Sequence, residues 1–144
     1  MERKEVPIED LNLEQLNTVG KQVEGDINSY SSYYTSLKVA LAKFSDNKDY
    51  IKDINNCSNK EILVPITSSL YIPGKCGDIK NVMIEVGANY FVGTNIEKAD
   101  GFCDRKLKII KESMDKIDSI IKTKNEQLSF INHNIIAKQT QVKK

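Results

Sequence analysis

The fold is decided by the stretch Glu61-Ile62-Leu63-Val64-Pro65-Ile66-Thr67-Ser68-Ser69-Leu70-Tyr71-Ile72-Pro73-Gly74-Lys75. It is rich in apolar and β-branched residues, a composition typical of short strands bounded by turns. We expect strands over 61–66 and 69–72. Pro65 cannot donate a ladder hydrogen bond, which places its strand at a sheet edge or at a bulge. Pro73-Gly74 is a turn dipeptide and is expected to follow the second strand.

A second pair of strands follows. Alternating apolar residues predict strands over 82–86 and 90–92, and Gly87-Ala88-Asn89 between them favours a turn. Two such hairpins have unpaired edges and too little apolar surface to be stable alone, so we expect them to join the β segments of other subunits. The residues expected at this assembly interface are Val64, Tyr71, Ile72, Val82, Ile84, Tyr90 and Phe91.

Outward from this β segment the period of the pattern changes from two to seven. Apolar residues recur at every seventh position on both sides: Leu16, Val23, Tyr30, Leu37, Phe44 and Ile51 before it, and Leu107, Met114, Ile121, Leu128, Ile135 and Val142 after it. A repeat of seven keeps one stripe of a helix against a partner helix, as in a coiled coil. The alternative is a pair of ordinary bundle helices, which are seldom this long without a break.

Local signals mark the helix ends. Asn12 with Gln15, and Thr94 with Glu97, have the spacing of capping boxes at helix starts. The polar residues from 55 to 59 favour turns and should end the first helix.

These signals predict a first coiled-coil helix over 11–57, two β-hairpins for assembly over 61–93 and a second coiled-coil helix over 95–142, in one domain spanning 1–144. The fold class is therefore mainly α with a small β segment. Because the helices have nearly equal lengths, we expect a long antiparallel α-helical coiled-coil hairpin with the two β-hairpins between its helices.

An antiparallel pairing also predicts which residues face each other, to within one helical turn of about four residues. Val23 should lie near Ile131, and Asp26 should reach the ammonium group of Lys124. The other expected neighbours are Tyr30 with Lys124, Leu37 with Ile117, and Phe44 with Ile110.

The composition excludes several classes of function. The chain has 144 residues, of which 21 are basic and 20 acidic, so its net charge of +1 gives no strong attraction to nucleic acid or anionic lipid. No apolar run is long enough to span a bilayer. The first residues do not form a signal peptide, and we expect a chain that stays inside the cell.

Residues that could carry chemistry are few and scattered. Cys57, Cys76 and Cys103 form neither a C-x-x-C pair nor a zinc pattern, and the single histidine, His133, has no clustered ligands beside it. No phosphate-binding glycine motif is present. We therefore expect no catalytic residue, no metal site and no cofactor, and a protein that is not an enzyme.

The quoted stretch from Glu61 to Lys75 closely resembles the β-segment signature of alpha-class prefoldin subunits, and is most similar to the subunit-five branch of the eukaryotic family. Residues 82–92 are similar to that family's second hairpin, and residues 11–16 to the start of its first helix. One departure is Gly87-Ala88-Asn89, where family members usually have a more glycine-rich turn.

The resemblance implies a hetero-hexamer of two alpha-class and four beta-class prefoldin subunits. It further implies an ATP-independent co-chaperone that binds unfolded or nascent proteins such as actin and tubulin and passes them to the cytosolic chaperonin. The expected location is cytoplasmic, with nuclear presence also open, and neither nucleic acid nor membrane is an expected partner. The alternatives are a coiled-coil scaffold and a transcription-related adaptor subunit.

In the predicted topology both termini lie at the end of the helix pair that is remote from the β segment. Helix ends fray because their last backbone groups lack partners, so apolar side chains there can be exposed to an unfolded client. The residues expected to contact clients are Leu11, Leu13, Leu16, Val19, Ile131, Ile135, Ile136 and Val142.

Overall fold

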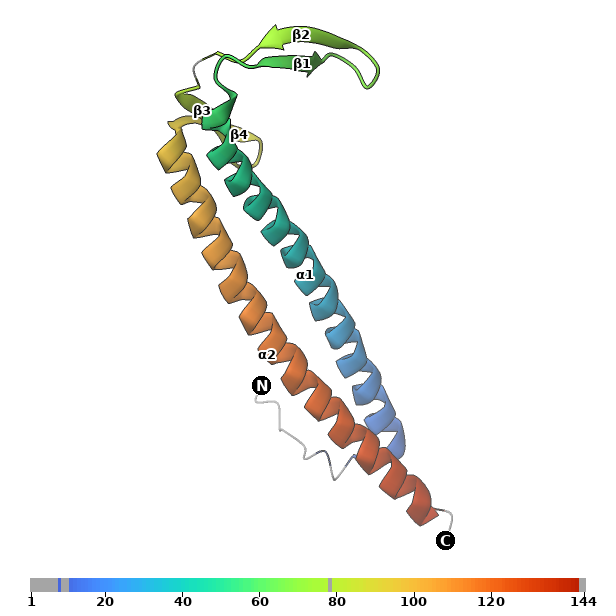
Figure 1. Ribbon diagram of the computed structural model, residues 1–144. Helices are drawn as coiled ribbons and strands as arrows, with labels where there is room; N and C mark the ends of the chain where they lie inside the picture. Colours follow the sequence, from blue (N-terminus) through green and yellow to red (C-terminus); the bar gives the residue numbers. More distant parts are fainter. Residues whose placement is uncertain (1–7, 9–10, 78, 143–144) are drawn as a thin grey trace. The chain divides into compact units, whose positions relative to one another are not determined.

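The computed structural model describes residues 8, 11–77 and 79–142, except the side chains at 55, 141 and 142. Its main elements, in chain order, are α1 (Leu13–Ile54), β1 (Glu61–Pro65), β2 (Tyr71–Lys75), β3 (Asn81–Gly87), β4 (Tyr90–Asn95) and α2 (Ile96–Val142) (Figure 1). A short 3-10 helix, Asn55–Cys57, follows α1. Two long helices with two β-hairpins between them confirm the predicted fold class.

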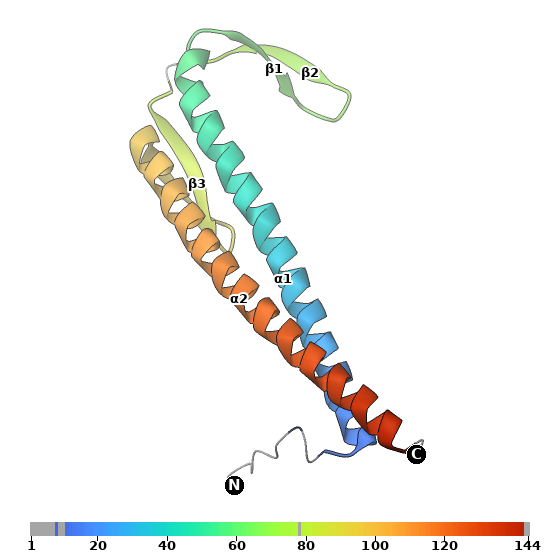
Figure 2. The same cartoon turned by 60° about the horizontal axis from the view of Figure 1, so that its bottom comes forward.

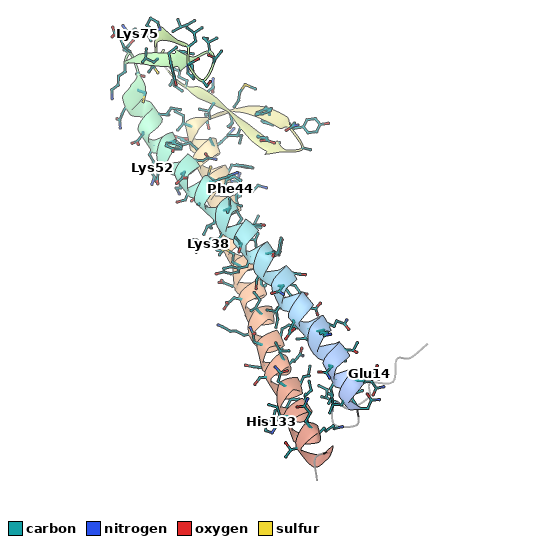
Figure 3. The ribbon with its side chains drawn as sticks, turned by 90° about the vertical axis from the view of Figure 1, so that its right-hand side faces the viewer. Glu14, Lys38, Phe44, Lys52, Lys75 and His133 are labelled. Atoms are coloured by element: carbon teal, nitrogen blue, oxygen red, sulfur yellow. The ribbon has the colours of Figure 1, made fainter. Side chains whose placement is uncertain are left out.

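The chain divides into two compact units, and each is described by itself. The first unit contains residues 1–38 and 112–144, and the second contains residues 39–111. In the first unit α1 and α2 run side by side in opposite directions (Figures 1 and 2). Glu14, near the start of α1, and His133, near the end of α2, lie at the same end of this unit (Figure 3). We call this end, where α1 begins and α2 finishes, the terminal end.

The core of the first unit lies close to the terminal end. Leu16 and Ile131 are fully buried, and Val23 joins them in one apolar cluster. Gly20 is also buried and lets α2 approach closely, since a Cβ atom at Gly20 would sit 3.6 Å from Cγ2 of Ile131. The predicted proximity of Val23 and Ile131 is confirmed by this cluster.

A polar pair lies further along the same helix seam. The ammonium group of Lys124 donates a 2.8 Å hydrogen bond to the Asp26 carboxylate, as predicted. Lys138 reaches across to the backbone carbonyl of Leu11 at 2.5 Å. In both contacts the α2 residue lies about one helical turn earlier in the sequence than the expected alignment of Val23 with Ile131 would place it. The prediction allowed a shift of this size.

Each helix start carries a side-chain cap, but only one of the two is the predicted cap. Asn12 and Gln15 form a reciprocal capping box, with hydrogen bonds of 3.0 and 2.8 Å. The predicted capping box of Thr94 with Glu97 is wrong. Asn95 caps α2 instead, accepting a 2.9 Å hydrogen bond from the backbone N–H of Lys98. The strand β4 ends at Asn95 and α2 begins at Ile96, so Asn95, directly before the helix, is in the position to cap it.

In the second unit an aromatic contact and an ion pair join the two helices. The rings of Phe44 and Phe102 lie 6.3 Å apart between centroids. Lys48 forms ion pairs with Asp104 and, at 3.9 Å, with Asp100. Ala99, Cys103 and Ile110 are buried on α2 along this seam.

The first hairpin is formed by β1 and β2, which pair antiparallel from Glu61 with Lys75 to Pro65 with Tyr71. The expected turn at Pro73-Gly74 is wrong, because both residues lie inside β2. A Cβ atom at Gly74 would lie 3.1 Å from Cγ2 of Val64, so a larger residue there would have to displace the Val64 side chain slightly. The loop spans 66–70 instead, closed by a 2.8 Å hydrogen bond from the Ile66 N–H to the Leu70 carbonyl.

The chain enters β1 through a type II turn. Ser58 has φ −53° and ψ 130°, Asn59 has φ 62°, and the N–H of Lys60 bonds to the carbonyl of Cys57 at 3.1 Å. Asparagine tolerates the left-handed conformation that the third turn position demands. The helix α1 ends at Ile54, directly before the polar segment 55–59 to which the sequence assigns the end of the first helix, and the short 3-10 helix Asn55–Cys57 follows it.

The second hairpin is formed by β3 and β4, with a bulge between Glu85 and Gly87. Ala88 and Asn89 both have positive φ, 49° and 61°, as a type I′ hairpin turn requires. The predicted turn is confirmed, and Ala88 occupies a conformation that costs about 1–2 kcal/mol in a residue with a Cβ atom.

Gly25 allows a test of how much the low helix propensity of glycine reduces the stability of α1. It lies inside α1, and a Cβ atom there would meet nothing within 4 Å. Gly25→Ala should therefore raise the free energy of unfolding by about 0.5–1 kcal/mol, measured by urea unfolding followed by circular dichroism. Gly87→Ala is the matched control and should destabilise, because Gly87 has φ 131°. A lower unfolding midpoint for Gly25→Ala would contradict this assignment of α1.

Candidate assembly surface

The first hairpin is apolar on both of its faces. Successive side chains of a strand point to opposite faces, and the register therefore groups them. One face carries Ile62, Val64 and Ile72, and the other carries Leu63 and Tyr71 beside Pro65 and Pro73. Every residue of β1 is exposed, Leu63 to 68%.

A two-stranded ribbon with two apolar faces cannot cover itself. Two strands supply one layer, and burying an aliphatic side chain requires a second layer against it. Fully burying each of these side chains would stabilise the protein by about 1.5–3 kcal/mol. Covering the exposed hairpin with another apolar surface would therefore be strongly favourable. Within the described part of the chain no element covers either face of β1. The geometry suits an interface with another polypeptide.

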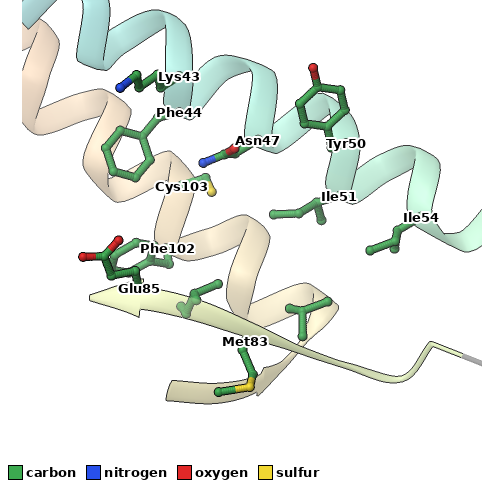
Figure 4. Close-up of a pocket in the computed structure, with 12 residues that line it drawn as sticks. Lys43, Phe44, Asn47, Tyr50, Ile51, Ile54, Met83, Glu85, Phe102 and Cys103 are labelled. Atoms are coloured by element: carbon green, nitrogen blue, oxygen red, sulfur yellow. The ribbon is translucent and has the colours of Figure 1, made fainter. Parts of the chain in front are cut away.

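The second hairpin has one covered and one uncovered face. Along β3, Val82 and Ile84 are half-buried, and they line a hollow of about 470 Å³ together with helix residues such as Phe44 and Ile51. Met83 also borders this hollow, but its side chain lies on the other side of β3 (Figure 4) and is 72% exposed. The chain's own helices therefore shield one face of this hairpin only.

The predicted assembly residues fall into two groups in the structure. Val64, Tyr71, Ile72, Tyr90 and Phe91 are exposed and available to a partner. Val82 and Ile84 face the chain's own helices, and their part in assembly stays a prediction. Sequence reasoning left out Leu63 and Met83, although the two-residue alternation could have placed both on the open faces.

The residues predicted to contact clients also differ in exposure. Leu16 and Ile131 are completely buried and close the terminal end of the first unit, and Leu11, Leu13, Val19 and Ile135 are half-buried. Ile136 is 64% exposed and offers its side chain to solvent. The side chain of Val142 lies outside the described residues. In this conformation Ile136 is the predicted contact most accessible to a client.

The two titratable groups near these surfaces whose pKa is shifted are Cys103 and Lys48. Burial raises the pKa of the Cys103 thiol, so this cysteine stays protonated and poorly nucleophilic at neutral pH. A hydrogen bond to Asp104 raises the pKa of Lys48 and keeps it charged. Among the described residues, no group of three or more His, Cys, Asp or Glu side chains could hold a metal ion, and no helix is long and apolar enough to cross a membrane.

The family model and the related proteins that match this chain all belong to one family. A family model of prefoldin subunits matches residues 23–141. The human protein named prefoldin subunit 5 is 36% identical over 121 residues, covering 83% of this chain and 79% of its own. A probable prefoldin subunit 5 from Dictyostelium discoideum is 34% identical, covering 90% and 81%. One from Schizosaccharomyces pombe is 32% identical, covering 95% and 91%.

A solved structure agrees at the level of the fold. The cryo-EM structure of filamentous PFD from Methanocaldococcus jannaschii superposes with a TM-score of 0.71 at 16% identity, covering 81% of this chain and 98% of that chain. The match of the family model over most of the chain, together with these relatives, shows that the chain belongs to the prefoldin subunit family, a family of non-enzymatic chaperone subunits that act in a complex with one another.

Proposed function

We propose that this chain is an alpha-class subunit of a hetero-hexameric prefoldin, with two alpha-class and four beta-class subunits, that holds unfolded actin and tubulin without ATP. The same proposal has the complex pass these clients to the chaperonin in the cytosol. The single observation that carries it is the first hairpin, whose two apolar faces are both open in the isolated chain. A scaffold that used only its helices would have no need of such a ribbon.

The two surfaces of the chain suit two interactions of different strength. The hairpins offer many apolar residues on short, ordered strands, and a permanent interface buries such residues together. The terminal end of the first unit offers isolated side chains such as Ile136 beside a packed core. A contact with one partly buried aliphatic side chain is worth about 1–3 kcal/mol at most, which allows release without an energy source.

Several weak contacts can still hold a client when they act together. Subunits joined through their hairpins would each contribute one pair of helices, and simultaneous contacts raise the effective affinity through high local concentration. A folding client that buries its own apolar residues would lose these contacts one after another. Transfer to a chaperonin then needs only a competing apolar surface.

Assembly through the open hairpin faces is tested by Met83→Asp. The Met83 side chain is largely exposed in the lone chain, so the substitution should leave the fold intact. Burying an unpaired carboxylate in an apolar interface is strongly unfavourable, and the variant should not co-purify with the other prefoldin subunits. Size-exclusion chromatography of the co-expressed subunits gives the readout, with circular dichroism of the chain to confirm its helicity.

The control for this test is Tyr33→Asp, which places the same charge on an exposed residue of α1 in the first unit, whereas both hairpins belong to the second unit. It should assemble like the unmodified chain. Normal recovery of the hexamer with Met83→Asp would remove this face of β3 from the interface. Ile84→Asp would be a less direct test, because Ile84 is half-buried against the chain's own helices.

Client capture at the terminal end is tested by Ile136→Gln. This exposed residue lies outside the buried cluster, so the hexamer should form with unchanged stability. Loss of one apolar contact should weaken client binding several-fold at that subunit. The expected result is a higher ratio of hexamer to denatured actin needed to prevent aggregation, measured by light scattering.

Tyr50→Gln provides the matched control, because Tyr50 is equally exposed but lies on the part of α1 in the second unit. It should protect actin as the unmodified hexamer does. If Ile136→Gln also protected actin at the original ratio, client contact would have to lie elsewhere. Deleting whole helix ends is less informative, since it would remove the buried Leu16 or Ile131.

A further inference from the structure

Two of the three cysteines lie at the base of the first hairpin. Cys57 is the last residue of the 3-10 helix that precedes β1, and Cys76 directly follows β2. The antiparallel pairing of β1 with β2 brings these two ends of the segment together. Both residues are half-buried, so neither thiol is sealed off from solvent.

Lys60 is hydrogen-bonded to both of these cysteines. Its N–H bonds to the Cys57 carbonyl at 3.1 Å, and its carbonyl accepts a 2.9 Å hydrogen bond from the N–H of Cys76. The N–H of Asn59 bonds to the Cys76 carbonyl, also at 2.9 Å. Asn59 has φ 62°, and a residue in this conformation directs its own N–H and the next one toward a common side. Consecutive donors therefore hold the carbonyls of Cys57 and Cys76 close together.

The spacing at this turn is of the size that a disulfide bridges. The Cα atoms at the two ends of a β-turn, here Cys57 and Lys60, lie within about 7 Å of each other. Paired residues of antiparallel strands, such as Lys60 and Cys76, have Cα atoms about 5.5 Å apart. A disulfide joins Cα atoms about 4.4–6.8 Å apart. The Cys57 thiol donates only a weak 3.6 Å hydrogen bond to the Asp53 carbonyl, so rotation about its Cα–Cβ bond frees the sulfur to turn toward Cys76.

Cys103 differs from this pair and serves as an internal comparison. It is buried on α2, and burial raises the pKa of its thiol. A thiol that stays protonated reacts slowly with an oxidant, because the thiolate is the nucleophile. Cysteines that respond to oxidants are instead accessible and have a second cysteine beside them. Cys57 and Cys76 meet both conditions.

From this arrangement we propose that Cys57 and Cys76 form a redox-modification site, at which a peroxide produces a disulfide within the chain. One thiolate attacks a peroxide oxygen, which breaks the O–O bond, releases hydroxide and leaves a sulfenic acid on that sulfur. The second thiolate attacks this sulfur, forms the S–S bond and displaces another hydroxide. The two thiol protons convert both hydroxides to water. Two thiols and one hydrogen peroxide thus give one disulfide and two water molecules, with two electrons passing from sulfur to the peroxide.

The disulfide would close the first hairpin at its base. A hairpin of two strands is only marginally stable by itself, and a disulfide removes many open conformations of the segment that it closes. The bond also prevents further oxidation of either sulfur to the irreversible sulfinic acid, whereas cellular thiols can reduce it again. The site is thus a reversible fastening of the hairpin, and the proposal does not depend on the partner subunits or on the clients.

The experiment oxidises the full, folded chain with dilute hydrogen peroxide, blocks the remaining thiols, and then unfolds and digests the chain with trypsin. Cleavage after lysines 52, 60, 75 and 80 places the two cysteines in the peptides 53–60 and 76–80. Mass spectrometry with and without a reductant detects these peptides as a disulfide-linked pair. An equal mixture of unlabelled and isotope-labelled chains distinguishes a bond within one chain from a bond between two chains, because only the latter joins a labelled to an unlabelled peptide.

We expect the linked pair 53–60 with 76–80 to come from single chains and to be about tenfold more abundant than any pair containing Cys103. Oxidation in urea should remove most of this preference, because pairing in the unfolded chain depends only weakly on the length of the loop. Cys103→Ala should retain the linked pair, and Cys57→Ser and Cys76→Ser should each leave a single thiol that reaches the sulfinic acid. Comparable amounts of all three pairings in the folded chain would overturn the proposal. Linked pairs of mixed label, or two separately oxidised thiols without a bond, would overturn it as well.

Discussion

The structure depends on one constraint: a ribbon of two short strands cannot bury apolar side chains that point to both of its sides. In the first hairpin, Leu63 and Val64 are neighbours in sequence and lie on opposite faces, and both are exposed. The second hairpin has one covered face, because the chain's own helices cover Val82 and Ile84. What is left open on the two hairpins is the apolar surface on which the proposed assembly rests.

The helix pair of the first unit shows how a long seam keeps its alignment. An unbroken apolar stripe could slide by a heptad at little cost, because each turn of the stripe resembles the next. The Asp26–Lys124 hydrogen bond makes one alignment different from the others. Both side chains remain partly exposed, so the pair contributes modestly to stability, roughly 0–1 kcal/mol, while a slipped register would leave two charges unpaired in the seam.

The elements that follow a repeating pattern are predicted correctly from the sequence. The turn and the helix cap that depend on one particular neighbour are not. The heptad repeat predicts the helices, and the Asn12–Gln15 capping box predicts the start of α1, because periodicity and capping are local properties of the sequence. The dipeptide Pro73-Gly74 predicts a turn by its usual preference, which does not include the effect of the strand beside it. Gly74 lies in a strand because it pairs with Ile62 of β1, a contact between residues twelve apart in the sequence. The cap at Asn95 was missed for a related reason, since β4 extends to the helix start.

Both prolines of the first hairpin are compatible with its internal ladder. The hydrogen bonds from the Ile66 N–H to the Leu70 carbonyl and from the Cys76 N–H to the Lys60 carbonyl set the alternation of the ladder. This alternation places Pro65 and Pro73 at positions whose backbone groups point away from the paired strand. A proline at such a position removes only an outward donor, so the pairing of β1 with β2 stays complete. Two residues that are poor strand formers by composition are therefore tolerated here because of where the register puts them.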